Sequence, residues 1–229
     1  MRLATFLQSY NKPLDCYERM SATCYKFPYE TCSAEFLKFA EEDLKEIGKR
    51  GNTNALANAK RAVDSQTEAI IQVLGISKAK SFPNRIANLN KVGLVAPRVL
   101  TRLSQLRNKL EHDFEVPERE IVEDFLDIAS LFLEVTNSVF KEHASQFAVY
   151  DKASDYNDLN GFVVELREDK KSMDVKMYKT NGKVALSIIN NSDIEYLPLL
   201  RLSILTDWSD ALESDEELIT EMIESIIYA

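Results

Sequence analysis

The hydrophobic period of this chain changes near residue 145, and that change limits the folds open to it. Before this point apolar residues recur at three- and four-residue steps, as on one face of a helix. After it apolar and polar residues alternate, as along a half-buried strand. The change predicts an α+β protein with two parts. Residues 1–145 are expected to form an antiparallel helical bundle with an N-terminal extension, and residues 146–229 a C-terminal α+β region with an antiparallel sheet.

The predicted helices rest on apolar stripes and on residues that start or stop a helix. Four main helices are expected, over residues 33–48, 52–74, 97–115 and 117–142. A short helix is expected after Pro83, and short helical pieces within residues 1–31. Gly75 suits a helix stop, and Pro97 and Pro117 suit first turns. Because the connections are short, neighbouring helices are predicted to be antiparallel.

The predicted strands follow the change of period. Four are expected, over residues 146–150, 162–166, 173–178 and 184–189, and Asn181-Gly182 between the last two is a hairpin signal. Residues 196–208 are apolar all round and fit a strand or a helix. Ser214 and Glu217 form a capping-box pattern, which predicts a last helix over residues 215–228.

Charge is distributed unevenly along the chain. The formal net charge of −9 opposes bulk attraction to nucleic acid. Residues 69–110, however, contain no Asp or Glu and eight basic residues, which gives +8: Lys78, Lys80, Arg85, Lys91, Arg98, Arg102, Arg107 and Lys109. Such a basic segment indicates a local anion-binding surface. A bundle that alternates acidic and basic faces for solubility would explain it equally well.

Composition also bears on compartment and cofactors. No apolar run approaches the ~20 residues of a membrane span, and the first ten residues lack an apolar stretch of signal-peptide length. Cys16, Cys24 and Cys32 are expected to be reduced thiols, because a spacing of eight with no nearby histidine fits zinc ligation poorly. We therefore expect a cytoplasmic protein that binds no membrane, no metal and no other cofactor.

One stretch carries residues suited to phosphodiester chemistry. Arg107 presents a planar donor fork that matches phosphate oxygens, and His112 can exchange protons near neutral pH. Asn108, one turn before His112, can hold the ring or contact a ligand. Together they meet the minimum for metal-free phosphodiester cleavage, in which one group moves a proton and another stabilises charge on phosphorus. The same spacing also fits a solvated arginine and a histidine at a helix C-terminus.

The direction of the two side chains adds a condition. At about 100° per residue, Arg107 and His112 point about 140° apart on an ideal helix. They can converge through the reach of the arginine, through a distorted last turn, or through residues from a second copy of the chain.

The whole string from Leu106 to Pro117, LRNKLEHDFEVP, resembles the signature of the HEPN superfamily: arginine, a polar residue, three free positions, then histidine. Arg107, Asn108 and His112 occupy those positions. By pattern the resemblance covers roughly residues 33–142, and by specific identity only the string itself. It implies an HEPN-like antiparallel helical bundle, here followed by the small antiparallel sheet and a C-terminal helix. It also implies dimerisation, so that two copies of the motif line one cleft.

The resemblance also implies a function. Many members cleave RNA without a metal, including toxins and phage-defence effectors, whereas others bind nucleotides or have lost activity. The expectation is a metal-independent endoribonuclease that acts as a homodimer in a defence or toxin-like role. Its catalytic residues are expected to be Arg107, Asn108 and His112, and its RNA-binding cations Arg98, Arg102 and Lys109. Asp64 and Glu68 are weaker candidates for a polar partner, and a solvent-facing acidic pair is the simpler interpretation of those two.

Phe114 departs from the pattern of the family's toxins, which often carry a tyrosine two residues after the histidine. An antitoxin that modifies this tyrosine could not act on Phe114, which weakens a toxin–antitoxin role more than it weakens a nuclease. The alternative hypothesis is a non-catalytic module that binds a nucleotide or a protein through the same helix. A protein regulator or antitoxin is a partner that either hypothesis allows.

Overall fold

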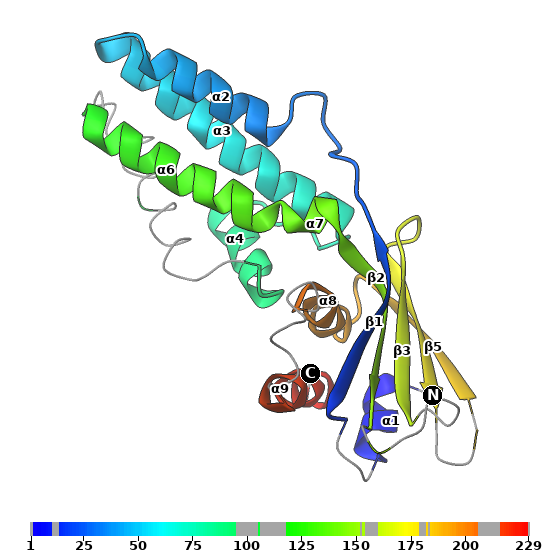
Figure 1. Ribbon diagram of the computed structural model, residues 1–229. Helices are drawn as coiled ribbons and strands as arrows, with labels where there is room; N and C mark the ends of the chain where they lie inside the picture. Colours follow the sequence, from blue (N-terminus) through cyan, green and yellow to red (C-terminus); the bar gives the residue numbers. More distant parts are fainter. Residues whose placement is uncertain are drawn as a thin grey trace. The chain divides into compact units, whose positions relative to one another are not determined.

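The computed structural model describes residues 2–10, 14–94, 105, 118–151, 153, 160–178, 182, 184–205 and 216–228 (Figure 1). The chain divides into two compact units. We call them the sheet unit, which is Met1–Tyr25, Leu74–Ser77 and Val139–Ala229, and the helical unit, which is Lys26–Val73 and Lys78–Ser138. The chain therefore starts in the sheet unit, forms the helical unit with one short return to the sheet unit at Leu74–Ser77, and ends in the sheet unit from Val139 on.

A five-stranded antiparallel sheet is the centre of the sheet unit. Its strands lie in chain order: β1 (Cys16–Thr23), β2 (His143–Tyr150), β3 (Gly161–Arg167), β4 (Ser172–Tyr178) and β5 (Val184–Asn190). Four of these strands follow one another directly in the chain, so short connections suffice to join them. β1 comes from the N-terminal region instead, and pairs with β2 from Cys16 opposite Tyr150 to Thr23 opposite His143.

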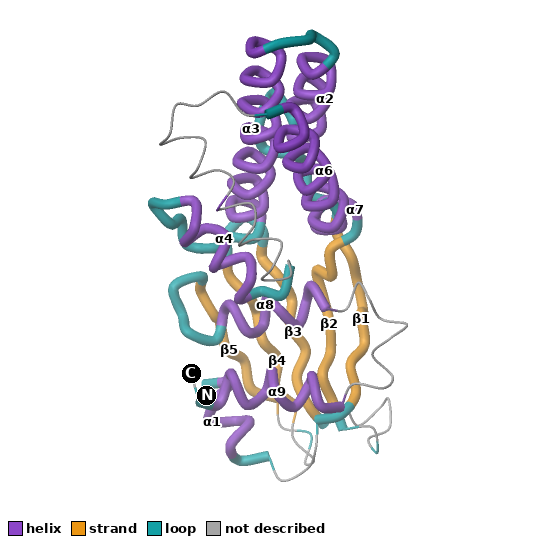
Figure 2. Tube along the Cα trace, turned by 90° about the vertical axis from the view of Figure 1, so that its left-hand side faces the viewer, coloured by secondary structure: helices purple, strands orange, loops and turns teal. Residues whose placement is uncertain are grey.

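Alternation along the strands assigns the largest apolar side chains to one face of the sheet. The register places Phe147, Val164 and Val175 in neighbouring positions on three strands, and all three are fully buried. Three helices cover this face (Figure 2): α1 (Leu3–Gln8) contacts β4, α8 (Tyr196–Leu205) contacts β2, and α9 (Glu216–Ile227) contacts β1. The core of the sheet unit therefore lies between the sheet and these helices.

The segment that leaves the helical unit after α3 is fastened within the sheet unit by two hydrogen bonds. The Tyr196 hydroxyl donates to the Leu74 carbonyl at 2.7 Å, and the Asn191 side chain donates to the Gly75 carbonyl at 3.0 Å. Gly75 has φ +65°, and a Cβ there would lie 2.8 Å from the Tyr196 hydroxyl oxygen. Only glycine satisfies both the positive φ and the close approach.

The helical unit contains α2 (Ser33–Leu44), α3 (Lys49–Val73), α4 (Phe82–Lys91) and α6 (Arg119–Thr136). Figure 1 shows α2, α3 and α6 side by side. α3 buries the small residues Ala55, Ala59 and Ala62, which lets its neighbours approach closely. In the same core the Gln66 side chain donates to the Thr136 hydroxyl at 3.0 Å, so this buried polar pair is hydrogen-bonded. A short helix, α7 (Ser138–Lys141), follows α6 and precedes β2.

The expected architecture, an HEPN-like antiparallel helical bundle followed by a small sheet, is wrong. The described residues form a mixed α+β structure around a five-stranded antiparallel sheet, and no such bundle is evident among them. The sheet also takes its first strand from within residues 1–31, which were expected to be helical. The two compact units also differ from two parts divided at residue 145. Met1–Tyr25 and Leu74–Ser77 belong to the same unit as the sheet.

The strand that the sequence analysis missed, β1, has no local sequence signal. No residue of Cys16–Thr23 is fully buried and most are exposed, so its sequence shows no alternation that would mark a strand. Its pairing with β2 joins residues more than 100 positions apart, which no local pattern can indicate. The ambiguous segment 196–208 contains α8. It is apolar all round because helix α8 packs against β2 on one side and α9 on another.

No helix in the described part of the chain combines the length and the apolar character needed to cross a membrane.

Candidate functional site

The residues expected to carry the chemistry lie outside the described residues. These are Arg107, Asn108 and His112, the cations Arg98, Arg102 and Lys109, and Phe114. Their assignment therefore stays a prediction. Gln105 is the one described residue between 95 and 117; it is helical and exposed, as a polar position off the predicted apolar stripe should be. What the structure does describe is the first half of the acid-free basic segment, and the other histidine of the chain.

Two cations of the basic segment share one carboxylate in the helical unit. Arg85 of α4 forms an ion pair with Glu68 of α3 through Nη1 and Oε1, and Lys78 Nζ lies 3.4 Å from the other Glu68 oxygen, Oε2. The Glu68 and Arg85 side chains are only 21% and 14% exposed, so this is a part-buried pair rather than a solvated one. The guanidinium of Arg85 also lies 6.0 Å from the centre of the Phe82 ring, within cation–π range.

The ion-pair cluster changes two expectations from the sequence. Glu68 and Asp64 were interpreted as a solvent-facing pair, and that is wrong, because both are part-buried and Glu68 is ion-paired. Glu68, Lys78 and Arg85 together carry a charge of +1. The pairing with Glu68, which precedes the acid-free segment, therefore offsets one of the two positive charges of Lys78 and Arg85. Lys80 and Lys91 are exposed, and no ion pair involves either of them within the part of the chain that the structure describes.

A tyrosine lies beside the cluster. The Tyr29 hydroxyl donates to Gln72 Oε1 at 3.3 Å. Burial, with a further contribution from the negative charge of Glu68, raises the pKa of Tyr29 above its ordinary value. Tyr29 therefore stays a neutral hydrogen-bond donor at physiological pH and supplies neither a base nor a nucleophile.

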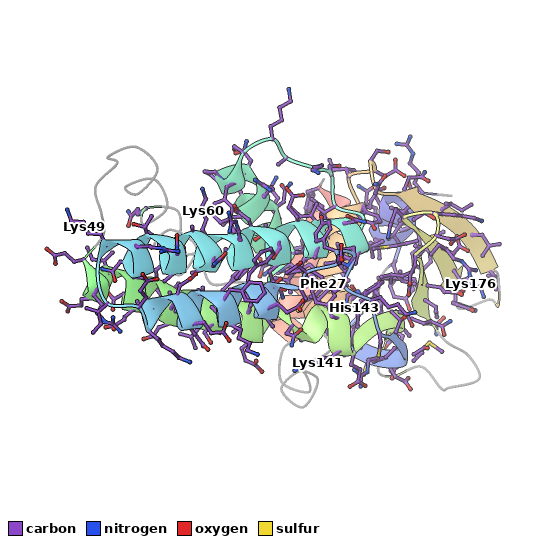
Figure 3. All side chains as sticks on the ribbon, turned by 90° about the horizontal axis from the view of Figure 1, so that it is seen from above. Phe27, Lys49, Lys60, Lys141, His143 and Lys176 are labelled. Atoms are coloured by element: carbon purple, nitrogen blue, oxygen red, sulfur yellow. The ribbon has the colours of Figure 1, made fainter. Side chains whose placement is uncertain are left out.

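His143 is the only other histidine of the chain, and it is inside the sheet unit. His143, labelled in Figure 3, begins β2 and is fully buried. Its Nε2 lies 3.2 Å from the hydroxyl oxygen of Ser203 on α8, and its ring centre lies 5.5 Å from that of Tyr25. The Ser203 hydroxyl donates to the Leu200 carbonyl at 2.7 Å. Since a hydroxyl has one proton, the assignment that satisfies both contacts puts the ring proton of His143 on Nε2.

The environment of His143 opposes its charged form. Burial lowers the pKa of the imidazole from 6.5 to about 4. Nδ1 is buried and has no hydrogen-bond partner among the described residues. A ring in this position is neutral at physiological pH, and a solvent-borne substrate cannot reach it. His143 therefore belongs to the core of the sheet unit.

The sequence contains a signal for this placement that the motif analysis did not use. Within β2, His143 has the same parity as Phe147 and Val149, and both of these are fully buried. The period of two therefore assigns His143 to the covered face of the sheet. No comparable signal exists for the pairing of Glu68 with Arg85, because the two residues lie on different helices.

Among the described residues, no three His, Cys, Asp or Glu side chains gather where they could hold a metal ion. Comparison of the chain with protein-family models, with curated proteins and with solved structures finds no match.

Proposed function

We propose that this chain is a metal-independent endoribonuclease in which Arg107 and His112 act on the phosphodiester and Asn108 orients them. The observation that carries the proposal is the string Leu106–Pro117, which joins an arginine, a polar residue and a histidine in the HEPN order at the end of an acid-free basic segment. A homodimer in a defence or toxin-like role is the setting that the resemblance supports.

The position of His143 supports the choice of His112. General acid–base catalysis near neutral pH needs a group that changes protonation there and can reach the substrate. His143 meets neither condition, because it is fully buried and its pKa is lowered to about 4. The chain has two histidines, so a reaction that needs an imidazole of this chain would use His112.

The proposed step uses only groups of the chain and of the RNA. His112 accepts the proton of a ribose 2′-hydroxyl, and the 2′-oxygen attacks the adjacent phosphorus while the bond from phosphorus to the 5′-oxygen breaks. Arg107 stabilises the negative charge that develops on the phosphoryl oxygens, as a guanidinium fork can do for two oxygens at once. The 5′-oxygen takes up the proton that His112 accepted, which returns the imidazole to its neutral form, and the products are a 2′,3′-cyclic phosphate and a 5′-hydroxyl.

The test is cleavage of a labelled single-stranded RNA by the full chain in excess chelator. We expect cleavage to persist, to yield cyclic phosphate ends, and to stop when the 2′-hydroxyls are methylated. Arg107→Ala and His112→Ala should each lower the rate by a factor of about 100 or more. Lys49→Ala, which alters an exposed cation at the start of α3, is the matched control and should cleave normally. Unchanged cleavage by His112→Ala would remove the assigned role.

A non-catalytic module that binds a nucleotide or a protein is the second candidate. Phe114, which stands where many of the family's toxins carry tyrosine, favours it. This candidate predicts no cleavage under any condition, together with RNA or nucleotide binding that weakens in Arg107→Ala.

A cytoplasmic location is part of the proposal. Cys16, Cys24 and Cys32 are free thiols in the structure, and Cys24 is exposed. Thiols of this kind persist in a reducing compartment.

A further inference from the structure

The last strand of the sheet, β5, presents an apolar row at the edge. Val184, Leu186 and Ile188 alternate along β5 and are 55%, 66% and 66% exposed. By register they share a face with Asp174, Lys176 and Tyr178 of β4, which is the face opposite to the one that α1, α8 and α9 cover. β5 lies at the end of the strand order and is an edge strand (Figure 2).

The backbone of the same three residues is available for pairing. The Asn191 N–H donates to the Lys171 carbonyl at 3.2 Å, which continues the register of β5 with β4 by one pair. Antiparallel strands alternate hydrogen-bonded and non-hydrogen-bonded pairs, so Ile189, Ser187 and Ala185 direct their N–H and C=O groups to β4. Those of Ile188, Leu186 and Val184 consequently point away from the sheet. At Asn190 the outward N–H donates to Asp193 Oδ2 at 2.7 Å, which ends this open edge.

The opposite edge of the sheet is protected, and β5 is not. β1 carries Glu18 and Arg19, its register with β2 shifts between Arg19 and Ser21, and Arg19 forms an ion pair with Glu142 at 3.0 Å. Charges and irregular register are the usual means by which proteins prevent strand addition at an edge. β5 has the sequence VALSIIN, without charge or proline, and its register with β4 is unbroken.

We propose that β5 pairs with β5 of a second copy of this chain, antiparallel and centred on Leu186. In that register Leu186 lies opposite the partner's Leu186, and Val184 lies opposite the partner's Ile188. The three pairs would exchange two backbone hydrogen bonds each, so every outward N–H and C=O of this stretch gains a partner. The three exposed side chains of each copy then form one apolar ladder on a single face.

Charge favours a second copy as the occupant. β5 has no charged residue, so no like charges face each other across the seam. The nearest strand with charges on this face is β4, and the two β4 strands would lie three strand spacings apart, roughly 14 Å. That separation exceeds the screening length of about 8 Å at physiological ionic strength. An unrelated peptide would need its own uncharged, alternating strand, whereas a second copy supplies one by symmetry.

The expected association is weak and depends on concentration. One strand from each copy forms a seam smaller than the ~800 Å² per partner of a standard interface. We expect monomer and dimer to exchange within the micromolar range or above. The inference is independent of the proposed RNA cleavage, because it concerns the sheet unit and its test contains no RNA.

The experiment is sedimentation velocity of the full chain from about 1 µM to about 500 µM. We expect the mean mass to rise with concentration towards twice its value at the lowest concentration, whether that value is the 26.1 kDa of one chain or that of a dimer formed through the motif. Leu186→Lys should weaken association by a factor of about 100, because two lysines then face each other. Met20→Lys is the matched control, since Met20 is 49% exposed on the protected strand β1, and its association should equal that of the unaltered chain.

A charge-pair rescue tests the register. Leu186→Lys and Leu186→Glu should each lose this concentration-dependent rise, and an equimolar mixture should recover it by pairing one chain of each variant. Circular dichroism of each variant must match that of the unaltered chain. A mean mass that does not change with concentration, a concentration-dependent rise that survives Leu186→Lys, or a mixture that does not recover this rise would each overturn the proposed pairing.

Discussion

The two histidines of this chain differ in the role that can be assigned to them, and the burial of His143 is the reason. His143 faces the covered side of the sheet, contacts Ser203 and Tyr25, and is fully buried. His112 follows an acid-free basic segment and forms part of a string that combines arginine, asparagine and histidine. The first histidine therefore bears on the stability of the sheet unit, and the second is the proposed proton carrier of the reaction.

Of the three changes predicted for His143 and its surroundings, a permanent charge at position 143 should lower the free energy of unfolding most. His143→Lys places an ammonium group at a fully buried position, and an unpaired buried charge costs on the order of 4 kcal/mol. Urea unfolding monitored by circular dichroism measures the loss. His143→Met is the control for volume, and should cost less than ~1.5 kcal/mol. Equal stability of the lysine variant and the unaltered chain would mean that position 143 is open to water.

Acidification should cause the next largest loss in the free energy of unfolding. The pKa of His143 is about 4 in the folded chain and 6.5 when unfolded, so the unfolded chain binds more protons between these values. The contribution of the neutral His143 ring to stability is fully present above pH 6.5 and is lost as the pH falls towards 4. Its size is about 3 kcal/mol between pH 7.5 and pH 4.

The matched variant for this prediction is His143→Phe, which retains a ring but cannot take up a proton. Unfolding free energies of both proteins are measured at several pH values, and their difference removes the contribution of the carboxylates. We expect the unaltered chain to lose about 3 kcal/mol more than the variant. Parallel curves would show that His143 does not titrate on unfolding.

Removal of the partner of His143 should have the smallest effect of the three. Ser203→Ala leaves Nε2 without its contact and is expected to cost about 1–2 kcal/mol. Ser225→Ala is the control, because the Ser225 hydroxyl donates to the Met222 carbonyl of α9 in the same way that Ser203 donates to Leu200, and the described part of the chain has no histidine bonded to Ser225. A loss no larger for Ser203 than for Ser225 would show that the histidine contact contributes nothing.

The sequence predicts much of the secondary structure where burial is one-sided. α3 and α6 follow from their apolar stripes. α3 spans Lys49–Val73, close to the expected 52–74, whereas α6 spans Arg119–Thr136 and ends six residues before the expected 142. β4 and β5 follow from alternation and from the hairpin signal, and Gly182 between them has φ +68°. β1 could not be predicted, because an edge strand without a buried residue shows no periodicity.

Pairings between elements are the part that a single sequence does not contain. Glu68 and Arg85 each look like ordinary surface charges in the sequence, and only the packing of α4 against α3 joins them. In the fold, the carboxylate of Glu68 therefore offsets part of the positive charge of the basic segment. The proposed role of Arg107 and His112 follows from the resemblance of the string Leu106–Pro117 to the HEPN signature, because spacing alone also fits a solvated arginine and a histidine at a helix end.

Ring NMR of the two histidines, followed from about pH 8 to about pH 5, tests the distinction between them most directly. With two histidines in the chain, the variant His112→Gln assigns both signals. We predict that the His112 signal moves through a titration near neutral pH, as the proposed reaction requires, and that the His143 signal stays at the position of a neutral ring. A His143 signal that titrates above pH 6, or a His112 signal that does not move, would contradict the account.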